Sequence, residues 1–136
     1  MRDRQGFTLV ELADVLVVIG LLAAIAIPSY ESMRIQAREA AAVAAAHTVQ
    51  VAAEDFAAAH GGVYSDQEAD IRPRLPGGGL LENAFTGGAT EPQFGIAAAT
   101  PGQVGLVTVV EHGLAVGYTV TAFGQGGLIA VFTSGQ

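Results

Sequence analysis

Residues 7–27 read FTLVELADVLVVIGLLAAIAI, and this stretch decides the fold. From Val15 to Ile27 no side chain is polar, and the five apolar residues before this run are interrupted only by Thr8, Glu11 and Asp14. A helix needs about 20 residues to cross the apolar core of a bilayer, so the stretch is long enough only with its two carboxylates included. Two arginines in the hydrophilic residues 1–6 favour an N-terminus on the inner side of a membrane.

A secretory signal peptide and a plain N-terminal anchor are the simplest interpretations of this stretch. A signal peptide should end in small residues at a cleavage site, and residues 23–26 (AAIA) partly fit that pattern. The chain continues, however, as helix-forming sequence through residues 29–60, which a discarded segment would not explain.

Residues 29–60 are the most regular part of the chain. They contain neither proline nor glycine, and residues 37–46 are mostly alanine, the best helix former. Apolar side chains recur every seven residues at Ile35, Ala42, Val49 and Phe56, with alanine pairs beside them. This spacing predicts an amphipathic helix with one apolar face. Gly61 and Gly62 predict its end, because glycine commonly follows the last helical residue.

A single helix over residues 7–60 would be roughly 80 Å long at about 1.5 Å per residue. That is far more than the width of a compact chain of this size, whose radius of gyration is about 14 Å. Half of the helix must therefore be covered by lipid or by another protein. Gly20 and Pro28 lie inside it, and Pro28 is expected to kink or loosen the helix because it lacks the N–H donor.

The period changes after residue 60. Residues 117–123 (GYTVTAF) alternate as a strand does, and turn signals separate this run from the apolar runs 94–99, 104–110 and 128–133. A sheet of three or four strands needs a cover, which the small-residue face of the helix can supply. We therefore predict an α+β fold, in which a long N-terminal α-helix packs on a small antiparallel sheet of three to four strands. The expected segments are a hydrophilic N-terminal segment (1–6), a helix covered by a membrane or by other protein (7–28), an amphipathic helix half (29–60), a Gly/Pro-rich connecting loop (61–92) and an antiparallel β head (93–136).

Composition excludes several classes of protein. The 136 residues suffice for one domain, and 51% hydrophobic against 14% charged residues is too apolar for a disordered chain. There is no cysteine, which rules out disulfides, thiolate nucleophiles and cysteine-based zinc sites. A formal net charge of −7 argues against a general nucleic-acid binder.

The N-terminal residues resemble a known signature. The motif GFTLVEL at 6–12, the apolar run behind it, AAIAIP at 23–28 and Tyr30 are similar to the N-terminal signature of type IV pilins and pseudopilins. The resemblance covers about residues 6–30 and implies that a prepilin peptidase cuts between Gly6 and Phe7 and methylates Phe7. Removing Arg2, Asp3 and Arg4 with the leader leaves 130 residues and changes the formal charge from −7 to −8.

The resemblance also implies partners and a location. The precursor would be a single-pass protein of the bacterial inner membrane with a cytoplasmic N-terminus. An inner-membrane assembly platform would then extract it and join it to other pilin subunits, in a homopolymer or a mixed filament. The product would be an extracellular pilus serving adhesion, twitching motility or DNA uptake, or a periplasmic pseudopilus.

Glu11 and Asp14 are the informative charges. A carboxylate inside a membrane span costs about 2.5–3.5 kcal/mol on insertion scales, so it needs a reason. In similar pilins, a glutamate at the place of Glu11 pairs with the N-terminal amine of a neighbouring subunit and sets axial register; the simpler interpretation is a carboxylate that snorkels or is protonated. Asp14 departs from the family pattern, which has an apolar residue there, and repels Glu11 one turn away. Two interpretations of Asp14 stay open. It is either a second assembly residue with a partner of its own in the filament, or a tolerated substitution near the membrane boundary.

Three function classes stay open. The first is a structural subunit of a type IV pilus-like filament, the second a pseudopilin of a type II secretion system, and the third an anchored binding module that does not polymerise. No arrangement of residues typical of an enzyme, a metal site or a cofactor site is visible, so we expect none of these. If a filament tip contacted DNA, Arg72 and Arg74 would be the residues to do so, but the negative net charge of the chain disfavours this contact.

Overall fold

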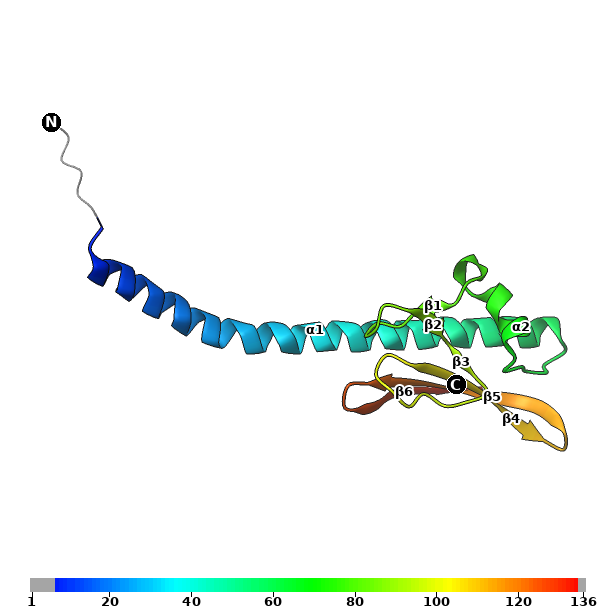
Figure 1. Ribbon diagram of the computed structural model, residues 1–136. Coiled ribbons are helices and arrows are strands. Elements are labelled where there is room, and N and C mark those ends of the chain that lie inside the picture. Colours follow the sequence, from blue (N-terminus) through cyan, green and yellow to red (C-terminus); the bar gives the residue numbers. More distant parts are fainter. Residues whose placement is uncertain (1–6, 135–136) are drawn as a thin grey trace. The chain divides into compact units, whose positions relative to one another are not determined.

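The computed structural model describes residues 7–134. The chain divides into two compact units, Met1–Ile35 and Gln36–Gln136. Helix α1 (Leu9–Ala59, 51 residues) begins in the first unit and ends in the second (Figure 1). Gly20 and Pro28 both lie inside this one helix, as expected from the sequence.

The second unit contains all other elements. Short helical segments follow α1, and two sheets complete the unit: β1 and β2 pair with each other, and the larger sheet has the order β3-β4-β5-β6. The bounds are α2 (Glu68–Ile71), η1 (Arg72–Arg74), η2 (Pro76–Gly78), β1 (Leu81–Glu82), β2 (Ala89–Glu91), β3 (Gln93–Phe94), β4 (Val104–Glu111), β5 (Leu114–Gly124) and β6 (Gly127–Thr133). The α+β class is confirmed, with α1 packed on a small sheet (Figure 1).

The core lies between one face of α1 and one face of the larger sheet. The helix contributes the predicted stripe, of which Ala42, Ala46, Val49, Ala53 and Phe56 are buried. Alternate residues of the strands meet this stripe, because side chains two apart lie on the same face of a strand. They are Val104 and Leu106 on β4 and Tyr118, Val120 and Ala122 on β5.

A carboxylate on α1 binds two tyrosines of this unit. Glu54 Oε1 accepts a hydrogen bond of 2.8 Å from the phenol of Tyr118, and Oε2 accepts one of 3.1 Å from the phenol of Tyr64. The two rings also meet edge to face, with centroids 5.1 Å apart. Burial, together with the bond to Glu54, raises the pKa of Tyr118 to about 12. These contacts fasten the C-terminal part of α1 to β5.

The connecting segment is more ordered than its glycines and prolines indicate. Glu91 at the end of β2 is 1% exposed and accepts three hydrogen bonds. They come from Asn83 Nδ2 (2.9 Å), the hydroxyl of Thr90 (3.0 Å) and the backbone N–H of Val104 (2.8 Å). Because Asn83 also accepts bonds from the N–H groups of Phe85 and Thr86, the loop before β2 is fixed to β4 through Glu91.

The first strand of the sheet differs from the expected one. A strand over 94–99 in an antiparallel meander was predicted, whereas β3 covers only Gln93–Phe94 and runs parallel to β4. Gly95 has a φ of 71°, which ends the strand, and the N–H of Ala98 donates to the hydroxyl of Thr121 at 2.8 Å. The other three strands form the predicted antiparallel meander.

Candidate functional site

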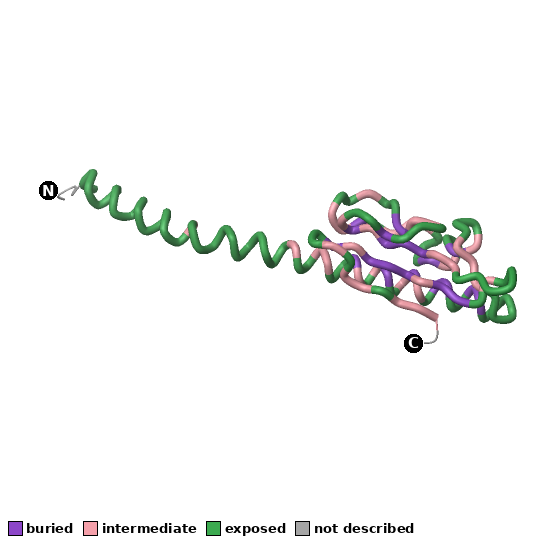
Figure 2. Tube along the Cα trace, turned by 90° about the horizontal axis from the view of Figure 1, so that it is seen from below, coloured by how far each residue is buried: buried purple, intermediate pink, exposed green. Residues whose placement is uncertain are grey.

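The first unit presents an uncovered apolar surface. Every residue from Phe7 to Arg34 is exposed apart from Ala23, which is half-buried (Figure 2). Leu9 and Ile25 are 85% and 75% exposed, and the large side chains between them are exposed on every side of the helix. Removing apolar surface from water is favourable by about 25 cal/mol per Å², so this surface is not a stable end state in water.

The same surface suits a membrane. By length and composition, α1 is one helix that could cross a bilayer, and its most apolar window is not buried within the chain. A helix that is apolar all round is covered either by lipid or by other protein.

Thr8 and Glu11 form a capping box at the start of α1. The N–H and the hydroxyl of Thr8 both donate to Glu11 Oε2, at 2.9 and 2.8 Å, and the N–H of Glu11 donates back to the Thr8 hydroxyl at 3.2 Å. This reciprocal pattern satisfies N–H groups that a helix start leaves free. No role was predicted for Thr8 from the sequence, although the spacing T-x-x-E before an apolar run is typical of a capping box.

Asp14 has no such partner. Its side chain is exposed one turn after Glu11, and within residues 7–134 no group forms a hydrogen bond or an ion pair with it. Of the two carboxylates predicted to act in assembly, only Glu11 has a hydrogen-bond partner among residues 7–134.

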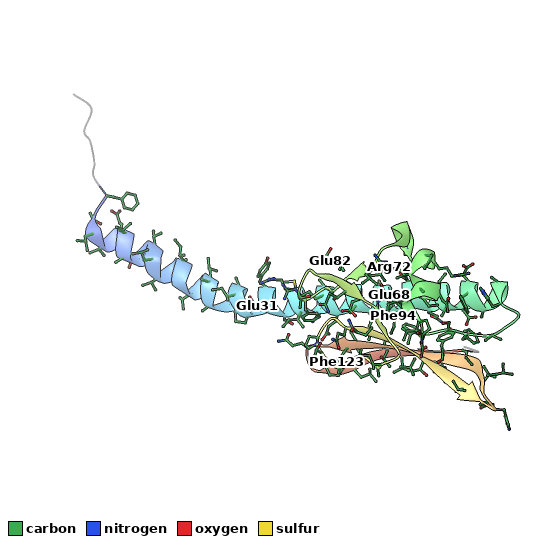
Figure 3. The ribbon with its side chains drawn as sticks, turned by 45° about the vertical axis from the view of Figure 1, so that its right-hand side comes forward. Glu31, Glu68, Arg72, Glu82, Phe94 and Phe123 are labelled. Atoms are coloured by element: carbon green, nitrogen blue, oxygen red, sulfur yellow. The ribbon has the colours of Figure 1, made fainter. Side chains whose placement is uncertain are left out.

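A second charged group lies near the end of the first unit. Arg34 Nη1 is 3.4 Å from Glu31 Oε1, and its guanidinium carbon lies 5.8 Å from the centre of the Tyr30 ring. Both side chains of the ion pair are about half exposed, at 44% and 58%, and Glu31 extends from α1 (Figure 3). Exposed pairs of this kind contribute about 0–1 kcal/mol, so Arg34 is weakly held.

The predicted processing and kink residues are placed as follows. Gly6 lies outside the described residues, and Phe7 directly after it is 77% exposed. A Cβ at Gly20 would meet nothing within 4 Å. Pro28 cannot donate to the carbonyl four residues earlier, so one hydrogen bond of α1 is missing there.

The described residues of the second unit form a hollow but no candidate metal site. A hollow of about 390 Å³ is lined by Ala37, Arg38, Ala41, Glu82 and Ala84, with Arg38 stacked over Phe85. No group of three His, Asp or Glu residues within 7–134 could hold a metal ion.

The two arginines considered for DNA binding are engaged within the protein. Arg72 bonds Glu68 at 2.9 Å. Arg74 pairs with Asp55 at 3.1 Å, donates to the carbonyl of Asp70 at 2.6 Å and lies over the ring of Phe56. Arg74 therefore fastens η1 to α1, whereas Arg72 joins η1 to α2.

Comparisons with known proteins point to one family. Residues 1–27 match the model of the prokaryotic N-terminal methylation motif. The type IV major fimbrial protein FimA of Dichelobacter nodosus is 30% identical over 130 residues, which is 95% of this chain and 71% of the relative. Two fimbrial proteins of Pseudomonas aeruginosa are each 43% identical over 54 residues, or 40% of this chain. The chain spans about a third of their length (35%) in these matches. No solved structure matches the chain significantly.

The motif at the N-terminus and the match along nearly the whole chain agree with the architecture, a long helix with an exposed apolar first half and a second half packed on a small sheet. The chain belongs to the type IV pilin family, a family of structural fimbrial subunits and not of enzymes.

Proposed function

We propose that this protein is a structural subunit of a type IV pilus-like filament, serving adhesion, twitching motility or DNA uptake, which polymerises through α1 after a prepilin peptidase has cut between Gly6 and Phe7. The observation that carries the proposal is the apolar surface of residues 7–27, which is exposed on all sides of the helix. A single binding partner would cover one face, whereas a bundle of like helices covers every face.

The same helix supports a membrane stage before assembly. Its apolar window is long enough to span a bilayer, so the precursor would be held in the bacterial inner membrane with its N-terminus in the cytoplasm. An inner-membrane platform would then transfer it to the filament. The change replaces lipid around the helix with neighbouring helices, so the apolar surface stays covered throughout.

Glu11 would couple cleavage to assembly. In the uncut chain, the nitrogen of Phe7 is part of a peptide bond and carries no charge. Cleavage creates an amine there, and this cation can pair with Glu11 of a neighbouring subunit. The carboxylate of Glu11 is held at the helix start by Thr8, the residue that follows the new amine. Methylation of Phe7 keeps the positive charge of the amine.

The alternative of a pseudopilin in a type II secretion system receives less support. All three relatives described above are named as fimbrial proteins, which favours an external filament. The third possibility, an anchored module that does not polymerise, gives no reason for a processing motif at residues 1–27.

Intact-mass spectrometry of membrane and sheared surface fractions tests the proposal, with the Glu11→Ala variant beside the wild type. We expect a 130-residue species that begins with methylated Phe7 in both fractions of the wild type. Glu11→Ala should remain in the membrane and be absent from the sheared fraction. Glu31→Ala, which removes an exposed carboxylate from the same helix, should assemble normally.

An uncut 136-residue species found only in the membrane would contradict the proposal and leave an anchored module. A processed species confined to a short periplasmic filament would support the pseudopilin instead. Normal filament yield from Glu11→Ala would show that Glu11 does not set the register.

A further inference from the structure

The charges of the mature apolar helix do not balance. Residues 7–27 carry the carboxylates of Glu11 and Asp14, whereas the N-terminal amine would be their sole cation. If the amine of one subunit pairs with Glu11 of another, Asp14 is left over in every copy. An ionised carboxylate enclosed by apolar helices is strongly disfavoured unless a cation pairs with it.

Resting on the proposed filament, we propose that Asp14 of one copy forms an ion pair with Arg34 of a second copy, displaced by about 30 Å along the filament axis. Both residues are exposed on α1 within the first unit. The contact adds a second register-setting pair to that of Glu11, and it needs no other kind of subunit.

The axial displacement follows from the helix. Asp14 and Arg34 are twenty residues apart on α1, and a rise of about 1.5 Å per residue separates them by about 30 Å. The pairing of Glu11 with the amine at Phe7 needs a displacement of only about 6 Å. A helical filament surrounds each subunit with neighbours at several displacements, so one neighbour can supply the amine and another can supply Arg34.

The direction of the two side chains fits an open polymer. At about 100° per residue, twenty residues rotate Arg34 by about 200° from Asp14, so the two project from nearly opposite sides of α1. When parallel helices of the same orientation lie side by side, the facing surfaces are opposite sides of the helix. Asp14 of one copy therefore faces Arg34 of the next, and the same step can be repeated without closing. Head-to-tail contacts of this kind build filaments.

Arg34 is the cation best able to make this contact. Its pair with Glu31 is long, at 3.4 Å, and about half exposed, so its loss leaves Glu31 in water at little cost. Arg38 lies over Phe85, while Arg72 and Arg74 are paired with Glu68 and Asp55. Arg34 also lies seven residues beyond the apolar run, where it can stay outside the membrane before assembly.

Cysteine cross-linking tests the geometry directly, because the chain contains no native cysteine. We expect Asp14→Cys/Arg34→Cys filaments to give a ladder of disulfide-linked oligomers on oxidation. Asp14→Cys/Met33→Cys is the matched control. Met33 lies at nearly the same height but about 100° away around the helix, and a disulfide requires Cα atoms within about 7 Å. A ladder from the control pair but not from the Asp14/Arg34 pair would overturn the proposal.

Charge exchange tests the interaction itself. Asp14→Arg and Arg34→Asp should each lower filament yield by about tenfold or more, because each brings like charges together. The double variant Asp14→Arg/Arg34→Asp should restore the yield to within about threefold. Since arginine at position 14 could impair insertion, membrane level and processed mass are measured for each variant, and Asp14→Asn with Arg34→Gln provides a neutral pair.

The outcomes separate this inference from the proposed function. Absence of wild-type subunits from any filament would defeat the proposed function. Wild-type filaments with equal yields from all single variants and no cross-link would overturn the ion pair alone. Loss of filaments from changes at Asp14 but not at Arg34 would also overturn the ion pair, because Asp14 would then act in assembly through a group other than Arg34.

Discussion

Glu91 is the residue on which the connecting segment depends. It is 1% exposed and accepts bonds from Asn83, Thr90 and the backbone of Val104. Removing the carboxylate leaves the side-chain amide of Asn83 and the N–H of Val104 without their partner in a site that water does not reach. Hydrogen bonds to a charged group contribute about 1.5–3 kcal/mol each, and an unsatisfied buried group costs about 1–3 kcal/mol.

We therefore expect Glu91→Ala to lower the free energy of unfolding by about 2–4 kcal/mol. Urea unfolding of detergent-solubilised protein, followed by circular dichroism, measures the change. Glu82→Ala on the neighbouring strand is the control, because its side chain is exposed and its loss should change stability by less than about 0.5 kcal/mol. Equal effects from the two variants would show that the bonds of Glu91 do not stabilise the fold.

Single residues were predictable where the reason for their position is local. Glu11 and Asp14 stand out because a carboxylate within an apolar run is costly wherever the chain folds. Glu91 did not stand out, since its partner Val104 lies thirteen positions further along the chain and only the fold brings them together. Thr8 lay between these cases, because its capping partner is three residues away and the spacing was visible.

Helix α1 shows how far an element can be predicted from its period. The seven-residue spacing identified the buried face, and the paired glycines identified the end, where Gly61 and Gly62 adopt positive φ values of 68° and 88°. The N–H of Gly62 donates to the carbonyl of Ala57 at 2.8 Å, which satisfies one of the last carbonyls. Both signals depend on residues that are close together in the sequence, and the folded structure agrees with both.

Strand β3 shows the opposite case. The apolar run at 94–99 was predicted to be a strand, yet most of it crosses close to β4 without pairing as a strand. Gly105 on β4 makes this crossing possible, because a Cβ there would overlap the backbone of Ile96 and Ala98. The close approach joins segments that no spacing in the sequence connects.

Gly105→Ala should therefore destabilise the protein by about 2 kcal/mol or more, since the obstructing atoms are backbone atoms that cannot rotate away. Gly126→Ala is the matched control, because a Cβ at Gly126 would meet nothing within 4 Å and should change stability by less than about 0.5 kcal/mol. Thermal unfolding of both variants decides the matter. A neutral Gly105→Ala would mean that the segment 96–98 can move away from β4 without loss.

At the scale of the whole chain, the residues that form the core and those proposed to form the filament are separate. No buried residue precedes Ala42 among those described, and the apolar run ends at Ile27. The second unit, Gln36–Gln136, contains the complete hydrophobic cluster. Folding of this unit should therefore not require residues 7–27, whose surface is uncovered within the chain.

A fragment of residues 30–136 should consequently be soluble, folded and monomeric. We expect its melting temperature to lie within about 5 °C of that of the full chain in detergent, because the fragment keeps every core contact. Size-exclusion chromatography with light scattering and thermal circular dichroism measure both properties. The same fragment with Phe56→Ala is the control, and loss of this core side chain should cost about 3–5 kcal/mol. An aggregated fragment, or one that melts without cooperativity, would show that residues 7–29 are also needed to maintain the core. The residues for folding and those for assembly would then not be separate.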